Sequence, residues 1–220
     1  MTKNAISGRI TRALYGSRRY SDPTKAPGYF TPGVWIDVTP AGMSMDPDYL
    51  GPGDGGNYGV EFLGADTANP GHIYVSCHQQ GIWKSTNYGA TWTGPINTGT
   101  SASAITNSAG GVTVVPVGSG SPPILYVNNG RGSTGLYKSV DGGVNFTKVT
   151  IVPPFPADRE DIYPVVFNPY NKDHILFTGH EQNKIGQSTD GGATVSSVTM
   201  PTNPAGGSGF IFFIDTGNPT

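Results

Sequence analysis

The feature that most restricts the fold of this chain is a turn pattern that occurs three times. Each copy has a serine, an aspartate or asparagine two residues later, and a glycine four residues after the serine. The serines are Ser85, Ser139 and Ser188, which lie 54 and then 49 residues apart. A strand-like segment, a polar loop and a second strand-like segment precede every turn, as in HIYVSCHQQGIWKS before the first one. A repeat of this length predicts successive four-stranded blades of a β-propeller.

The residue types in the pattern explain how such a turn forms. The side-chain oxygen of Asp or Asn can accept hydrogen bonds from amides of its own turn, and glycine adopts the positive φ angles of tight hairpins. An aromatic residue or valine then restarts the next strand. The residues of the pattern are Ser85, Asn87, Gly89, Trp92, Ser139, Asp141, Gly143, Phe146, Ser188, Asp190 and Gly192, with Val195 in the last aromatic position.

Composition agrees with a fold of many short strands. Glycine (33 residues) and proline (19 residues) form almost a quarter of the 220 residues, whereas only 13% are charged. Glycine does not recur at every third position, which excludes collagen. Clusters of Val, Ile, Tyr, Phe and Thr alternate with turn residues, which disfavours disorder. This alternation is typical of a sandwich, a barrel or a propeller.

The charge distribution is uneven. The net charge is −2, which disfavours general nucleic-acid binding. Residues 1–33 nevertheless form a basic arm, in which Asp22 alone opposes Lys3, Arg9, Arg12, Arg18, Arg19 and Lys25. We interpret this arm as a solvated or packing tail, and we expect neither a nucleic-acid nor a membrane partner. No run of about 18 apolar residues occurs, so we expect a soluble chain whose secretion signal is absent or removed.

Counting the strand-like segments predicts three blades and two additional strands. The blades span about residues 57–95, 110–151 and 161–200. Residues 34–40 are predicted to form the outer strand of a preceding blade, and residues 209–217 the inner strand of a following one. These strands do not complete a ring. We therefore expect a fragment of a longer protein, an assembly with copies of itself or with another chain, or an atypical small propeller.

The three turns resemble the Asp-box, or bacterial neuraminidase repeat, of sialidases, xyloglucanase-type glycoside hydrolases and sortilin-like receptors. The resemblance covers about residues 34–215, and the segments ADTANPGHIYV and FNPYNKDHILF are similar to a lead-in of the xyloglucanase-like branch. It implies an all-β fold, a partial β-propeller of about three complete four-stranded Asp-box blades plus flanking strands, over residues 34–220. Asp-boxes lie away from the active-site face in that family, which implies that the turn aspartates are structural rather than catalytic.

Two sets of loops are expected to reach the ligand-binding face of such a propeller. One set joins the second and third strands of each blade, at residues 77–80, 128–131 and 179–182. The other set leads into inner strands at residues 53–58 and 158–163. Their polar and aromatic side chains suit a sugar-binding funnel. The candidate substrate-binding residues are Asp54, Asn57, Tyr58, His78, Gln79, Arg131, Arg159, Tyr163 and His180.

Catalysis by a glycoside hydrolase needs two carboxyl groups on either side of the scissile bond. The candidate catalytic residues on these loops are Asp161, Glu160 and Glu181, which are also ordinary loop-solubilising residues. The resemblance argues against a sialidase, because the three-arginine clamp of that family cannot be completed from Arg131 and Arg159 alone. Xyloglucanase-type enzymes use two aspartates from the two sides of a cleft between two propellers, and this chain supplies at most one side. Whether the chain is an enzyme therefore stays open.

These features predict a carbohydrate-active or carbohydrate-binding Asp-box propeller that resembles xyloglucanase-like glycoside hydrolases, with a glycan or polysaccharide as partner. The alternative is a non-catalytic protein-interaction module or a self-assembling propeller module. We expect no cofactor and no metal site, because His78 and His180 belong to non-neighbouring blades. Family resemblance suggests an extracellular location. His72 and His174 are expected to be scaffold residues, since the middle blade has Ile124 in their place.

Overall fold

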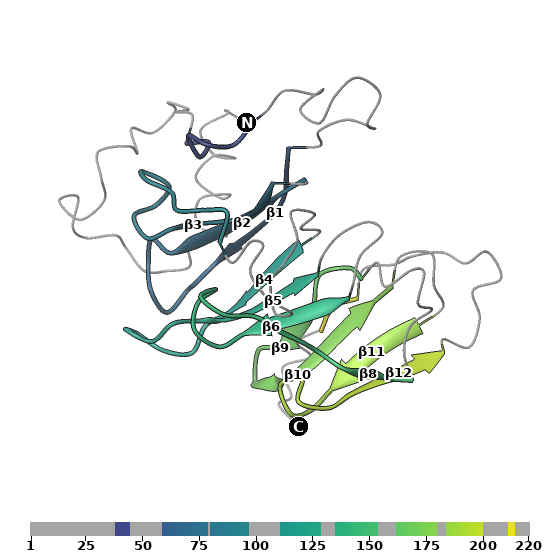
Figure 1. The fold of residues 1–220 in the computed structure, drawn as a ribbon. Coiled ribbons are helices and arrows are strands. Elements are labelled where there is room, and N and C mark those ends of the chain that lie inside the picture. The colour runs from purple at the N-terminus through teal and green to yellow at the C-terminus, as the bar shows by residue number, and fades with distance from the viewer. Residues whose placement is uncertain are drawn as a thin grey trace, which may run out of the picture. The chain divides into compact units, whose positions relative to one another are not determined.

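The computed structural model describes residues 38–44, 59–78, 80–96, 111–128, 135–153, 162–179, 184–199 and 211–213. These residues form strands, turns and loops, and no helix among them could span a membrane (Figure 1). The chain divides into two compact units, residues 1–37 and residues 38–220. All described residues belong to the second unit, so the basic arm at residues 1–33 lies outside them.

The strands form three successive sheets. Sheet 1 has the order β1 (Val60–Ala65), β2 (Ile73–Cys77), β3 (Gly81–Ser85). Sheet 2 has the order β4 (Gly111–Val115), β5 (Ile124–Asn128), β6 (Leu136–Ser139), β7 (Thr147–Lys148). Sheet 3 has the order β9 (Val166–Asn168), β10 (Asn171–Thr178), β11 (Lys184–Ser188), β12 (Val195–Thr199), β8 (Ile151–Val152). Apart from β8, every strand pairs antiparallel with its neighbour in sequence, as expected for propeller blades.

The outer strands of sheets 1 and 2 are shorter than the sequence pattern predicts, whereas β12 of sheet 3 is close to the predicted length. In sheet 1 the outer segment has a single described bridge, in which Thr93 exchanges two backbone hydrogen bonds of 2.9 and 2.8 Å with Lys84. Pro95 interrupts the pairing because it has no N–H group to donate, and beyond it the amide of Ile96 donates to the carbonyl of Ile82 over 2.8 Å. In sheet 2 the predicted outer strand divides, because β7 pairs with β6 whereas β8 pairs in parallel with β12 of sheet 3.

The two predicted flanking strands are described only in part. Residues 38–40 of the first and residues 211–213 of the second belong to none of the three sheets. The remainder of both segments lies outside the described residues, so both strands stay predictions.

The sheets pack face to face in chain order. In each sheet, the strand residue paired with the turn serine (Ile73, Leu125 or Ile175) defines equivalent positions. We call the face that turns toward the preceding sheet the front face, and the opposite face the back face. The front face of sheet 2 packs on the back face of sheet 1, in a core of Tyr74, Ile82, Val112, Val114, Leu125, Val127, Tyr137 and Phe146.

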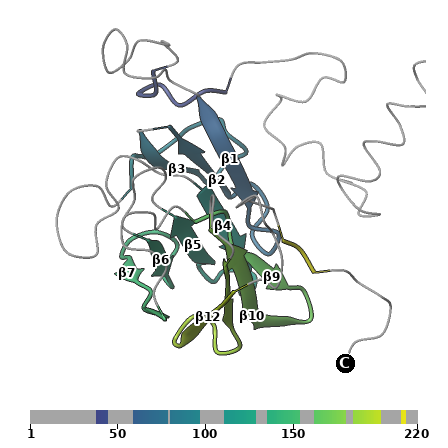
Figure 2. The ribbon, with the colours of Figure 1, turned by 90° about the vertical axis from the view of Figure 1, so that its right-hand side faces the viewer.

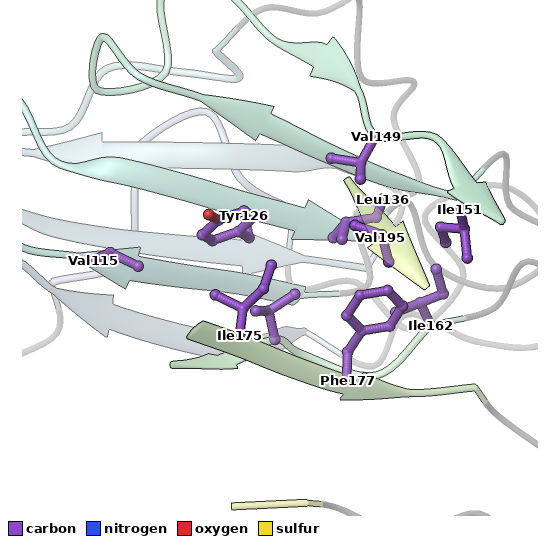
Figure 3. Close-up of a cluster of buried hydrophobic side chains, with 10 residues drawn as sticks. Val115, Tyr126, Leu136, Val149, Ile151, Ile162, Ile175, Phe177 and Val195 are labelled. Atoms are coloured by element: carbon purple, nitrogen blue, oxygen red, sulfur yellow. The ribbon is translucent and has the colours of Figure 1, made fainter. Parts of the chain in front are cut away.

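The contact between sheets 2 and 3 repeats this arrangement. Figure 3 shows Tyr126 of sheet 2 and Ile175 and Phe177 of sheet 3 pointing into one core. Leu136 on the back face of sheet 2 belongs to the same core. A glycine at position 186 makes room for the ring of Phe177, because a Cβ there would overlap the ring carbons.

A tyrosine and a lysine on the back faces of sheets 1 and 2 reach the turn of the next sheet. The Tyr74 hydroxyl donates to the carbonyl of Gly142 over 3.3 Å, and the Tyr126 hydroxyl donates to that of Gly191 over 2.7 Å. The Lys138 ammonium also donates to Gly191, over 2.6 Å. Burial, with a smaller effect of the Asp66 charge, raises the pKa of Tyr74 to about 12, so its hydroxyl stays protonated and can donate.

All three turns contain the same hydrogen bonds around a buried serine. The serine Oγ accepts from the amide of the glycine four residues later, over 2.8 Å at Ser85, 2.9 Å at Ser139 and 2.8 Å at Ser188. The serine hydroxyl in turn donates to the Asx side chain two residues later, over 3.0, 2.7 and 2.7 Å. The Asx oxygen accepts from the amide four residues further on, at Thr91, Asn145 and Thr194.

The two turn aspartates have lowered pKa values. Burial raises the pKa of Asp141, but hydrogen bonds from Asn145, Ser139 and Val144 outweigh it and hold the value at about 2. The side chain and the amide of Thr194, with Ser188, lower the pKa of Asp190 to about 2. Both carboxylates are therefore ionised at neutral pH as part of their turns.

The contact between Gly186 and Phe177 can be tested by overpacking. Gly186→Ala is expected to lower the free energy of unfolding by about 1–3 kcal/mol, because the new methyl group overlaps a buried ring. Gly118→Ala is the matched control, since no atom lies within 4 Å of a Cβ at that position. Urea unfolding measures both variants, and an equal effect of the two would contradict this packing.

The turn carboxylates predict a loss of stability in acid. Their folded pKa of about 2 lies below the ordinary value of 3.8, so the stability they contribute is complete above about pH 4 and is lost as the pH falls toward 2. Asp141→Asn/Asp190→Asn should stay folded, since the first turn already has Asn87. Its urea midpoint should change less than that of the parent protein across this pH range. Equal changes would show that these carboxylates do not titrate as described.

Candidate functional site

One edge of each sheet carries the loops that the sequence analysis assigns to ligand binding. Strand register places the ends of these loops side by side, with Val60 opposite Cys77 in sheet 1 and Gly111 opposite Asn128 in sheet 2. In sheet 3, Ile162 forms a bridge with Gly179. We call this the loop edge. The three serine turns lie at the opposite ends of the sheets, so the aspartates with lowered pKa values are distant from it along the strands.

Side-chain hydrogen bonds connect the inner parts of neighbouring sheets. β1 lies beside β4 (Figure 2). The Thr113 hydroxyl of β4 donates to the carbonyl of Val165, just before β9, over 2.6 Å. At the loop edge itself, the buried Asn128 amide group donates to the carbonyl of Ile162. The loop that follows Asn128 and the loop that precedes Ile162 therefore meet the sheets at neighbouring points.

Two of the predicted site residues, His78 and Tyr163, are described. The others, which are Asp54, Asn57, Tyr58, Gln79, Arg131, Arg159, Glu160, Asp161, His180 and Glu181, lie outside the described residues. His78 and Tyr163 both stand at the loop edge, in sheet 1 and sheet 3. His78 contacts Glu61 of its own sheet, whereas the amide of Tyr163 donates to the carbonyl of Thr178 over 2.8 Å.

His78 and Glu61 form a close pair. The Nδ1 atom of His78 lies 2.9 Å from Oε1 of Glu61, and the two side chains are 17% and 21% exposed. The amide of His78 donates to the carbonyl of Gly59 over 3.0 Å, which holds the start of the β2–β3 loop against β1. The interaction is a hydrogen bond when the imidazole is neutral and an ion pair when it is protonated.

A bulge in β1 explains the position of Glu61. The register shifts between Val60, which lies opposite Cys77, and Phe62, which lies opposite Ser76. Glu61 is therefore the extra residue, and a bulge redirects the side chain at that point. Glu61 was not among the predicted site residues, because strict strand alternation does not reveal where a bulge occurs. The available signal was an acidic residue in an otherwise apolar strand directly after a candidate loop.

Gln80 anchors the loop that contains His78. Its buried side-chain amide accepts from the amide of Ser44 and donates to the carbonyl of Ser44, each over 2.7 Å. Its backbone carbonyl accepts from the indole N–H of Trp83 over 3.0 Å. These contacts leave Gln80 with a structural role, so the loop is held at both ends before any ligand binds.

A further ionisable group near the pair is Cys77. Burial, with a smaller effect of the Glu61 charge, raises the pKa of this thiol to about 12. The thiol is therefore not a nucleophile at neutral pH.

Within the described ranges, no group of three or more His, Cys, Asp or Glu side chains could hold a metal ion. The pair offers a carboxylate acceptor and an imidazole, which suit hydrogen bonding to a polar ligand.

Comparison with known proteins gives structural matches only. No protein-family model and no curated protein matches the sequence. An ancestral GH74 enzyme matches with a TM-score of 0.52 and 23% identity, over 74% of this chain and 21% of its own. A GH74 enzyme from Niastella koreensis matches with a TM-score of 0.49 and 26% identity, over 64% of this chain and 22% of its own.

A GH74 xyloglucanase from Xanthomonas campestris matches with a TM-score of 0.48 and 18% identity, over 69% of this chain and 23% of its own. The chain therefore spans about a fifth of the length of these structures. At this identity the first match speaks for the fold alone. Together with the three successive antiparallel sheets, it identifies the described part of the chain as an all-β, partial β-propeller.

Proposed function

We propose that this chain is a carbohydrate-binding Asp-box propeller whose glycan site lies at the loop edge. The observation that carries the proposal is the half-buried His78–Glu61 pair, which a bulge directs to the edge where the polar loops begin. A carboxylate that accepts hydrogen bonds from an imidazole can also accept from sugar hydroxyl groups, which are the main polar groups of a glycan. The half-buried Tyr163 adds an aromatic ring at the same edge of sheet 3.

The three serine turns support the Asp-box part of the proposal. They share one set of serine and Asx hydrogen bonds, and strand order places them away from the loop edge, as the resemblance implies. The carboxylates Asp141 and Asp190 both accept hydrogen bonds within their own turns. Any reaction would therefore use other carboxylates, for which Asp161, Glu160 and Glu181 stay the proposed candidates.

The likeness in fold to GH74 structures supports a polysaccharide of the xyloglucan class as the first probe. One side of a cleft can bind a glycan without cleaving it, because hydrolysis requires a second carboxyl group across the bond. We propose binding as the function of this chain and hydrolysis only with a complementary surface. The alternative, an interaction module of the kind found in sortilin-like propellers, is favoured by the exposed sheet faces described below.

Glycan binding can be tested at the pair itself. Titration calorimetry with soluble xyloglucan oligosaccharides should show binding that Glu61→Gln and His78→Ala each weaken about tenfold or more, or roughly 1.4 kcal/mol. Asp173→Asn is the control, because it makes the same acid-to-amide change at an exposed position on the opposite edge of sheet 3.

The same titration applies to the proposed catalytic loop residues, with Glu160→Ala, Asp161→Ala and Glu181→Ala. Binding that survives all five changes would exclude the loop edge as the site. Absence of binding to xyloglucan and to a panel of other plant and bacterial polysaccharides would exclude the proposed function. Release of reducing sugar by the unmodified chain would assign hydrolysis to this chain alone.

A further inference from the structure

The front face of sheet 1 has no sheet against it in the described structure. Leu63 pairs with Val75 there, as Val112 pairs with Val127 on the front face of sheet 2. Val112 is 4% exposed because sheet 1 covers it, and Val165 in the same core position of sheet 3 is 3% exposed. Leu63, in contrast, is 65% exposed. A residue buried in two copies of the repeat is thus left uncovered in the first copy.

Residues 38–44 cover the outer half of this front face. Met43 packs on Val75 and Trp83, and the indole N–H of Trp92 donates to the carbonyl of Val38 over 2.6 Å. Connecting segments take the same role at the other two sheets, where Ile96 and Ile151 join the cores. Among the residues that the structure describes, no sheet packs on the inner half of the face, around Leu63 and the exposed Ala65.

The back face of sheet 3 is the complementary end of the array. Ile185 holds the position of Ile82 and Leu136, both of which are buried by the next sheet, but Ile185 is only half-buried. Leu176 is half-buried for the same reason, whereas the equivalent Tyr74 is fully buried. Beside them, the ring of His174 contacts the ring of Phe213 at 4.9 Å.

Each back face matches the turn that packs on it. The third residue after the turn serine has a positive φ in all three turns, with 59° at Tyr88, 69° at Gly142 and 65° at Gly191. A Cβ at Gly142 would lie only 3.3 Å from the Tyr74 hydroxyl, and a Cβ at Gly191 would lie 3.4 Å from the Lys138 ammonium. A back face with the Tyr–Lys pair therefore leaves little room for a side chain at this position of the turn that it receives.

The first turn differs from the other two at this position, and the back face of sheet 3 differs from the other two back faces. Tyr88 brings a Cβ to the position where glycine stands in the other turns, so it suits a back face without the tyrosine hydroxyl. Sheet 3 has Leu176 and Gln187 paired at the positions of the Tyr–Lys pair. The two exceptions in the repeat are complementary to each other.

We propose that the back face of sheet 3 of one copy of this chain packs on the front face of sheet 1 of a second copy. The contact repeats the two sheet-to-sheet contacts inside the chain and is head-to-tail, so copies continue to add until a ring closes. Two copies bring together twice the three sheets described, which falls within the roughly four to eight blades of known propellers. This proposal goes beyond glycan binding, since it uses sheet faces and not the loop edge.

The mass of the full chain in solution tests the proposal first. Sedimentation equilibrium should give a concentration-dependent mass at least twice the monomer mass of 23.0 kDa. Leu63→Glu should return the protein to the monomer mass, because it places a charge in the apolar contact. Val144→Glu is the matched control, since Val144 is 66% exposed in a turn outside the proposed contact. It should leave the association unchanged.

A second pair of variants tests the matching of turn and back face. Leu176→Tyr should weaken association about tenfold or more, because its hydroxyl would meet the Cβ of Tyr88. Adding Tyr88→Gly should restore association, since the two changes recreate the contact of Tyr74 with Gly142. Urea midpoints of all variants establish that each copy is folded.

Three results would overturn the proposal. A monomeric parent protein at all accessible concentrations would assign the two faces to another partner. An unchanged mass for Leu63→Glu would place any self-association elsewhere on the molecule. A double variant no better associated than Leu176→Tyr would remove the complementarity on which the choice of a second copy rests.

Discussion

The structure depends on a buried serine hydroxyl at the end of the third strand of each sheet. This one group accepts from the glycine amide and donates to the Asx side chain, so it satisfies a turn that would otherwise leave polar backbone groups buried and unpaired. Because each serine also lies opposite a strand residue of its own sheet, the turn sets the register of the second and third strands. Register decides which apolar side chains face the preceding sheet.

The turns do a second task through their geometry. The third residue after each serine has a positive φ angle. In two of the three turns, the carbonyl of this residue accepts a hydrogen bond from a tyrosine hydroxyl of the preceding sheet. The hydrogen bond that orders one blade is thereby coupled to the contact between blades. The motif of five residues therefore contributes both to the order within a sheet and to the contact between sheets.

Sequence reasoning predicts the parts of this fold that depend on local chemistry. The three turns, the paired second and third strands and the all-β class follow from residue type and spacing. The outer strands of sheets 1 and 2 were predicted too long, because the effect of Pro95 on pairing and the passage of β8 to another sheet depend on tertiary contacts. The bulge at Glu61 was missed for the same reason, since a one-residue shift in register leaves no periodic trace.

The parallel pairing of β8 with β12 joins sheets 2 and 3 more strongly than sheets 1 and 2 are joined. Backbone hydrogen bonds of Ile151–Val152 join the end of sheet 2 to the outer edge of sheet 3, so neither edge can open without disturbing the other. Within the described residues, sheets 1 and 2 touch through side chains and share no strand pairing. We therefore expect sheets 2 and 3 to unfold locally as one unit, and sheet 1, which carries the His78–Glu61 pair and is joined to sheet 2 through side chains, to open before them.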